Sequence, residues 1–283
     1  MAMVINTNIA SINSQRMLNK TNMSLATSME RLSSGLRVNS AKDDAAGLAI
    51  SDRMTSQIRG MTVAVRNAND GISMAQTAES AMGELTNTLQ RMRDLGVQAA
   101  NFGAVASGDR QKLQEEFSQL GKEVKRIIEN TSFNDKSILK GSLSQANFQV
   151  GANTAANNQI SITVGNLLSA SGLQDLVKAS PVSIGSGATS VNVRSAIDVI
   201  DLAIKSIDTN RSKLGAVQNR FNTTIANLQS SIENQSAARS RILDADFAVE
   251  TANLSRSQIL QQAGTAMLAQ ANQSSQSVLS LLR

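Results

Sequence analysis

Residues 193–232 read VRSAIDVIDLAIKSIDTNRSKLGAVQNRFNTTIANLQSSI, and this stretch decides the fold. Large apolar residues recur there at every seventh position, which is the period of helices that pack in the manner of coiled coils. The main series comprises Val193, Ile200, Ile207, Leu214, Phe221 and Leu228. A companion series comprises Ile197, Ile204, Ile225 and Ile232, with Arg211 and Gln218 interrupting it. The pattern predicts one long helix with a narrow apolar stripe.

The same period appears in the first half of the chain. One block carries Met61, Ala68, Ala75, Met82 and Leu89 in one series and Ala78, Leu85, Met92 and Ala99 in the other. The phase is unbroken through Asp70-Gly71, so we expect the helix to continue there despite the local turn signal. A shorter block comprises Leu113, Phe117, Leu120, Val124 and Ile127. Its predicted N-cap is Ser107 or Asp109.

The two ends of the chain carry lighter versions of the pattern. At the N-terminal end the stripe comprises Leu18, Leu25 and Leu32, and we expect Ile5, Ile9 and Ile12 to continue it. At the C-terminal end Leu260, Met267, Ser274 and Leu281 alternate with Gly264, Ala271 and Val278. A helix pair with so many small and polar residues would be marginal alone. Either these ends stay disordered, or neighbouring copies complete their burial.

The middle of the chain changes to a period of two. Residues 159–165 alternate apolar and polar side chains, and Phe148 and Val150 begin a similar run, which together predict a β-hairpin. Residues 180–190 are rich in Gly and Ser and read as a loop. The predicted fold is therefore mainly α, a long antiparallel coiled-coil-like bundle formed by the N- and C-terminal halves, with a small central β-hairpin region.

Two short breaks divide the helical segments. One lies at Ser33-Ser34-Gly35, followed by a capping-box pattern between Ser40 and Asp43, and the other lies within residues 240–246. The predicted divisions are residues 1–40, 41–141, 142–190, 191–239 and 240–283. The first and last are the terminal helices, and the central division is the hairpin and loop.

Composition excludes most catalytic chemistry. The chain has no Cys and no His, which removes thiolate and imidazole ligands, general bases and nucleophile pairs. Asp244 and Asp246 are paired carboxylates, but no third ligand accompanies them, and we interpret them as caps at a break between helices. We expect no cofactor and no metal, and a structural protein rather than an enzyme.

The charge pattern gives no sign of a nucleic-acid site. The net charge is +5, but the basic residues are interleaved with acids, and there is no Tyr or Trp for base stacking. Residues 1–25 alternate apolar with polar side chains instead of forming a signal peptide, and no apolar run is long enough to span a membrane. We expect no membrane insertion, and export without a cleaved signal peptide.

Helices placed at both ends favour self-assembly. A helix of about 35 residues would extend about 50 Å, longer than a small domain needs. Two such helices could pack against copies of themselves while the inboard helices form an independently stable bundle. Contacts of this kind are heterologous, and they propagate a helical filament if they do not close.

Residues 32–51, LSSGLRVNSAKDDAAGLAIS, closely resemble the N-terminal signature of bacterial flagellin. Further segments that resemble the family are 5–8, 67–73, 76–79, 214–221, 240–246 and 254–272. The resemblance implies a subunit of the flagellar filament, with segments 1–40 and 240–283 in an inner tube and the inboard segments in an outer layer. With only about 50 residues between the conserved halves, the chain resembles a near-minimal flagellin. The expected inner-tube packing residues are Ile5, Ile9, Ile12, Leu18, Leu25, Leu32, Leu260, Met267, Ala271, Val278 and Leu281.

The resemblance also implies partners. These are a homopolymer, an export chaperone at the C-terminal helix, a filament cap and hook–filament junction proteins, with export of the unfolded chain through the flagellar channel. Residues 90–101, QRMRDLGVQAAN, resemble the segment bound by the host flagellin-sensing Toll-like receptor. That resemblance implies contacts from Arg91, Leu95 and Glu116, secondary to a role in packing. Asp94 and Gly96 are smaller than the Glu and Ala of the motif, which bears on binding strength.

Three alternative functions fit the sequence less well. A chemoreceptor-like signalling hairpin would need stripes symmetric about a helical tip, but a β-hairpin occupies the middle of this chain. A flagellin with a metallopeptidase insert would need His-Glu-x-x-His, and the chain has no His. A hook–filament junction protein is the closest structural alternative, although the agreement with the flagellin signatures is nearly continuous.

Overall fold

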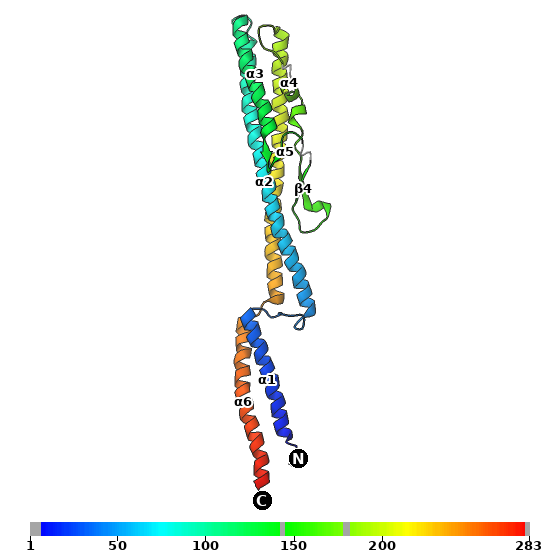
Figure 1. Cartoon of the computed structure of the whole chain (residues 1–283), viewed down its shortest axis with the longest axis vertical. Helices are drawn as coiled ribbons and strands as arrows, with labels where there is room; N and C mark the ends of the chain where they lie inside the picture. Colours follow the sequence, from blue (N-terminus) through cyan, green and yellow to red (C-terminus); the bar gives the residue numbers. More distant parts are fainter. Residues whose placement is uncertain (1–6, 142–144, 178–181, 281–283) are drawn as a thin grey trace. The chain divides into compact units, whose positions relative to one another are not determined.

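The computed structural model describes residues 7–141, 145–177 and 182–280, and side chains as far as residue 273. The fold is mainly α, as predicted, with helices α1 (Ile9–Ser34), α2 (Ala45–Ala99), α3 (Ser107–Asn130), α4 (Leu173–Val177), α5 (Ser190–Leu243) and α6 (Phe247–Ser280). The strands are β1 (Ser132–Phe133), β2 (Lys136–Ser137), β3 (Ala146–Gln149) and β4 (Gln159–Ile162). The chain forms two compact units, one of residues 1–57 and 233–283 and the other of residues 58–232 (Figure 1).

The second unit is built on the antiparallel pairing of α2 with α5. Arg93 Nε lies 2.7 Å from Asp201 Oδ1, and Gln218 Nε2 donates to Glu79 Oε2 at 2.9 Å, so residue numbers fall along α5 as they rise along α2. The main seven-residue series of both helices are buried, which confirms the predicted stripes. Helix α3 adds Phe117, Val124 and Ile128 to the same core. This unit therefore has an apolar core of its own.

Helix α2 runs through Asp70-Gly71 without a break, as the apolar phase predicted. The reason that glycine suits this position is the ring of Phe221 on α5. A Cβ atom at Gly71 would lie 2.7 Å from Phe221 Cζ. Phe148 on β3 meets the same ring edge to face, with centroids 5.8 Å apart.

The predicted β-hairpin is present. Strands β3 and β4 pair antiparallel, with Phe148 opposite Ile160. Because Phe148 contacts Phe221, the hairpin is attached to the helices at the Gly71 position. A second, smaller hairpin of β1 and β2 was not predicted, and its turn residues Asn134 and Asp135 have positive φ angles of 48° and 61°.

The break after α1 is held to the break before α6. Helix α1 ends at Gly35, whose φ is 72°. Beyond it, Arg37 N donates to Leu243 O at 2.6 Å, and Ala245 N donates to Gly35 O at 3.0 Å. Both breaks fall where the sequence predicted them.

Two predicted caps were wrong. The side chain that caps α2 is Asp44, whose Oδ1 accepts from Gly47 N at 2.8 Å, whereas Ser40 and Asp43 close a turn before the helix. Helix α3 begins after Ala106, which makes no side-chain cap hydrogen bond. In both cases the N-cap is the residue immediately before the first helical residue. It is not the residue that the sequence pattern indicated.

Gly71→Ala should destabilise the second unit by about 1–3 kcal/mol, because the new methyl group would overpack the buried Phe221 ring. The matched control is Gly83→Ala in the same helix, where nothing lies within 4 Å of the Cβ position. That change should stabilise by about 0.5–1 kcal/mol through helix propensity. Thermal unfolding followed by circular dichroism measures both. Equal effects of the two substitutions would contradict the packing of Phe221 on Gly71.

The turn before α2 gives a prediction on titration. The Ser40 hydroxyl, followed by the backbone N–H groups of Ser40 and Asn39, donates to the Asp43 carboxylate and lowers its pKa below the ordinary value. A lowered folded-state pKa means that these bonds favour the turn above the ordinary Asp pKa and are lost as the pH falls through the lowered one. Ser40→Ala should raise the pKa of Asp43 toward its ordinary value in a carbon-13 NMR titration. Ser33→Ala is the control, and an unchanged pKa in the Ser40 variant would show that the hydroxyl is not the cause.

Candidate functional site: the surface of the terminal helix pair

Helices α1 and α6 lie side by side and antiparallel in the first unit (Figure 1). Ser11 Oγ donates to Asn272 Oδ1 at 2.8 Å near one end of the pair. Further along, Gln261 Nε2 donates to Asn22 Oδ1 at 3.0 Å. Much of what joins the two helices is therefore polar.

The residues buried in this pair are mainly small or polar. Among the side chains of the pair that the structure describes, the buried ones are Ser11, Ser28, Glu250 and Ser257. Leu18, Leu25 and Leu32, which lie seven positions apart on one side of α1, are only half-buried. Gly264 allows a close approach, since a Cβ atom there would lie 3.3 Å from Leu18 Cδ1. The contact contains little apolar area for its length.

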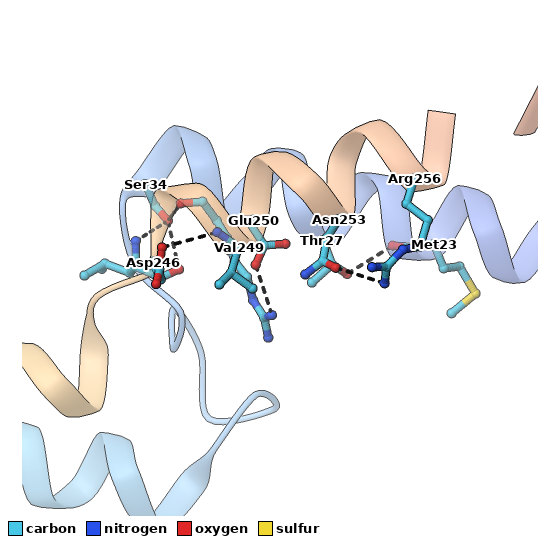
Figure 2. A network of polar contacts seen from close by, with 10 residues as sticks. Met23, Thr27, Ser34, Asp246, Val249, Glu250, Asn253 and Arg256 are labelled. Atoms are coloured by element: carbon cyan, nitrogen blue, oxygen red, sulfur yellow. Dashed lines mark hydrogen bonds and ion pairs between the residues drawn. The ribbon is translucent and has the colours of Figure 1, made fainter. Parts of the chain in front are cut away.

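One charged contact lies at the end of the pair near the break. Arg31 Nη1 lies 3.8 Å from Glu250 Oε2, and Glu250 is buried (Figure 2). The Arg31 Nε atom is buried without a hydrogen-bond partner. The Glu250 carboxylate is buried, while the Arg31 side chain is about one third exposed. Burying the carboxylate costs free energy that a long ion pair recovers only in part, so this contact adds little to the stability of the pair.

The start of α6 has a regular cap. Asp246 Oδ1 accepts from Ala248 N at 2.9 Å and from Val249 N at 3.2 Å (Figure 2). The Ser240 hydroxyl donates to Asp244 one turn earlier. The predicted capping role is confirmed for Asp246. Within the described residues no group of three or more His, Cys, Asp or Glu could hold a metal ion.

Large apolar side chains lie on the outside of the terminal pair. Among the described residues, ten of the sixteen exposed large hydrophobic residues belong to α1 and α6, and these ten are between 52% and 69% exposed. They are Ile9, Ile12, Met17, Met23, Met29, Phe247, Val249, Ile259, Leu260 and Met267. We call these ten residues the apolar surface. A helix in a soluble protein usually keeps its large apolar side chains on the inward face, whereas α1 and α6 also carry them on the outside.

A groove runs along part of this surface between α1 and α6. Its volume is about 1370 Å³. Its lining includes five members of the apolar surface, namely Ile12, Met17, Met23, Leu260 and Met267. An extended apolar surface of this kind is typical of a site that another protein chain covers.

The residues predicted to pack in an assembly fall into two sets. Ile9, Ile12, Leu260 and Met267 are exposed, whereas Leu18, Leu25, Leu32 and Ala271 are half-buried between α1 and α6. Ile5 and Leu281 lie outside the described residues, and Val278 lies in α6 beyond the described side chains.

One expectation about α1 was wrong. Ile9 and Ile12 do not continue the stripe of Leu18 and Leu25; its next position is Ser11, which is buried. Ile12 lies one residue further on, about 100° around the helix.

Sequence reasoning missed five members of the apolar surface, namely Met17, Met23, Phe247, Val249 and Ile259. It placed a sixth, Met29, in the stripe of α1, four positions after Leu25, but Met29 is exposed. A seven-residue period finds one stripe on each helix, and the five missed residues lie off it. Met23, for example, is two positions before Leu25 and so about 200° from it. The signal that could have found them is the presence of large apolar residues on more than one side of a helix.

The residues that resemble a receptor-binding motif lie in the second unit. Arg91 Nε and Nη2 both donate to Glu116 Oε1, at 2.9 and 2.7 Å, and join α2 to α3. Both side chains are about half exposed. Leu95 is 1% exposed and belongs to the core. A binding partner at this surface would therefore meet Arg91 and Glu116, with Leu95 supporting the helix beneath them.

No helix in the described ranges is both long enough and apolar enough to cross a membrane.

Comparison with known proteins gives concordant matches over the whole chain. Residues 5–144 match the family model of the bacterial flagellin N-terminal helical region, and residues 197–282 match that of the C-terminal helical region. Flagellin D of Vibrio anguillarum is 39% identical over 377 aligned positions, covering 100% of both chains. A flagellin of Halalkalibacterium halodurans is 44% identical over 281 residues, covering 99% of this chain and 100% of the relative.

A solved structure shares the fold. It is a putative flagellar hook-associated protein from Vibrio parahaemolyticus, with a TM-score of 0.57 and 12% identity, covering 71% of this chain and 100% of that chain. At this identity the likeness concerns the fold alone.

Proposed function

Because the chain belongs to the bacterial flagellin family, and so is a structural subunit of the extracellular flagellar filament and not an enzyme, we propose that its terminal helices pack against neighbouring copies to form the filament's inner layer. The single observation that carries this proposal is the apolar surface. Burying such side chains is worth about 1.5–3 kcal/mol each. A monomer leaves that free energy unused, and neighbouring copies of the same pair can supply the missing partners.

The exposed and half-buried sets then have different roles. Leu18, Leu25, Leu32 and Ala271 hold α1 to α6 within one subunit, while Ile9, Ile12, Leu260 and Met267 contact other subunits. Ile5, Val278 and Leu281 extend this packing at the ends of the helices. Because the apolar residues lie on several sides of the pair, more than one neighbour is needed to cover them. Contacts of that kind propagate instead of closing into a dimer.

The layer boundaries follow the two breaks. Segments 1–40 and 240–283 form the inner layer, segments 41–141 and 191–239 the outer layer, and segment 142–190 a short surface insert. The break at residues 35–44 contains the first boundary, and the break at residues 244–246 lies a few residues after the last one, which supports a division of this kind. The separate core of residues 58–232 supports an outer layer that is stable before assembly.

The same features support a route for export. The weak contact between α1 and α6 suits a chain that travels unfolded through the flagellar channel. An export chaperone would cover the exposed apolar residues of α6 in transit, and the filament cap and the hook–filament junction proteins would meet the terminal helices at the ends of the filament.

The double variant Leu260→Asn with Met267→Asn tests the assembly surface. Both side chains are exposed, so the monomer should unfold at the same temperature as the parent protein. Loss of about 1–2 kcal/mol per contact should raise the critical concentration for polymerisation on the order of a hundredfold. Sedimentation and electron microscopy of seeded filaments measure this.

The control for that variant is Gln258→Ser with Gln270→Ser, two exposed polar positions on the same helix. The control should polymerise like the parent. Truncation after Ala263 should leave the second unit folded and give no filaments. Normal filaments from the double variant or from the truncated chain would contradict the proposal.

We further propose a secondary role as a ligand of the host flagellin-sensing Toll-like receptor, favoured by the exposed Arg91–Glu116 pair. Arg91→Ala and Glu116→Ala should each lower potency in receptor-reporter cells by about tenfold, since such charged groups contribute most when they are preordered. Arg126→Ala is the matched control, because it breaks a similar exposed pair with Glu123 on α3. Equal potency of all three variants would contradict this role.

A further inference from the structure

The methionines of this chain divide into two groups by exposure. Met17, Met23, Met29 and Met267, here called the surface methionines, are between 53% and 69% exposed. Met61, Met74, Met82 and Met92 are at most 6% exposed, and all lie in the second unit. Of the remaining three, Met54 is half-buried, and residues 1 and 3 lie outside the described range. Exposure therefore separates the methionines of the terminal helices from those of the bundle.

The surface methionines lie where assembly needs apolar contacts. Met17, Met23 and Met267 line the groove between α1 and α6. Met23 is the most exposed member of the apolar surface, and its side chain extends away from α6 (Figure 2). Met29 is exposed on another side of α1. Each of the four is a thioether that water and small oxidants can reach.

Oxidation would change the chemistry of this surface while sparing the core. A peroxide transfers one oxygen atom to the thioether sulfur, which loses two electrons and becomes a sulfoxide, while the peroxide is reduced to water or an alcohol. The sulfoxide is polar and a strong hydrogen-bond acceptor. Burying it without a donor is unfavourable, so an apolar contact formed in assembly would be lost. The buried methionines escape because the folded bundle excludes the oxidant.

We propose that Met17, Met23, Met29 and Met267 form a reversible oxidation site that controls whether a free subunit can assemble. The proposal rests on the proposed packing of the terminal helices against neighbouring copies. Reductases that act on both sulfoxide epimers would restore the thioethers and, with them, assembly, because a dithiol supplies two electrons and two protons, becomes a disulfide, and the sulfoxide oxygen leaves as water. Subunits already in a filament would be protected, because their surface methionines are covered.

The experiment treats the purified full-length monomer with hydrogen peroxide and maps the sulfoxides by mass spectrometry of peptides. The surface methionines should oxidise about tenfold or more faster than the four buried ones. Thermal unfolding of the bundle should be unchanged. Seeded polymerisation of the oxidised subunit should need about a tenfold or greater increase in concentration, and both sulfoxide reductases together should reverse that increase.

Two variants test whether oxidation of the surface methionines, and not of other methionines, causes the loss of assembly. The variant with Met17→Leu, Met23→Leu, Met29→Leu and Met267→Leu should polymerise equally well before and after peroxide. The matched control, Met61→Leu with Met74→Leu, Met82→Leu and Met92→Leu, should remain as sensitive as the parent chain. Preformed filaments should oxidise at the surface methionines about tenfold more slowly than monomers.

Normal polymerisation of a parent chain that carries all four sulfoxides would overturn the inference, as would equal sensitivity of the surface-methionine variant. The proposed function would survive either of these results if untreated subunits polymerise and the variant with Leu260→Asn and Met267→Asn does not. If untreated subunits polymerise but that variant also assembles normally, the proposed function itself fails.

Discussion

The polarity of the terminal helix pair is the constraint on which the rest of the molecule depends. Serine, glycine, asparagine and one buried glutamate occupy much of the contact between α1 and α6, while ten large apolar side chains point to solvent. Such a pair gains little from folding alone and much from association. The second unit has the opposite arrangement, with its leucines, isoleucines and methionines enclosed. The second unit therefore has a complete apolar core, whereas the apolar residues of the terminal helix pair need neighbouring subunits to bury them.

Much of the fold was predictable because a long packed helix repeats the same apolar spacing many times in the sequence. The series through Ile200 and Ile207 fixes one buried face over the length of α5, and no local signal outweighs so many consistent positions. Asp70-Gly71 illustrates this: a turn signal in isolation, it lies inside α2 because Phe221 packs there. The β3–β4 hairpin was visible because its alternation contrasts with the helical period on either side.

The features that could not be predicted are set by single residues, or by apolar residues that follow no seven-residue period. The cap of α2 was misplaced because several polar residues near its start could serve, and only the path of the backbone selects Asp44 among them. The cap of α3 was misplaced because the residue at that position is Ala106, which has no side-chain hydrogen-bonding group to reveal it. The β1–β2 hairpin rests on the positive φ angles of Asn134 and Asp135, a preference of both residue types that two-residue strands do little to reinforce. At the candidate site, Leu260 and Met267 were found by their spacing, but Met23 and Ile259 lie off the period and only their exposure identifies them. Ile12 was placed on the wrong side of α1, because the stripe of Leu18 and Leu25 continues through Ser11, and an apolar pattern does not detect a serine.

The edge-to-face contact between Phe148 and Phe221 has a consequence for how this protein can vary. It fastens the β3–β4 hairpin close to its turn, at the second residue pair from the loop, while residues 153–157 of that loop are exposed. Chain length added among these exposed residues leaves the attachment of the hairpin to the helices in place. Evolution, or a protein engineer, can lengthen or replace the exposed part of this loop while the helices keep their sequence.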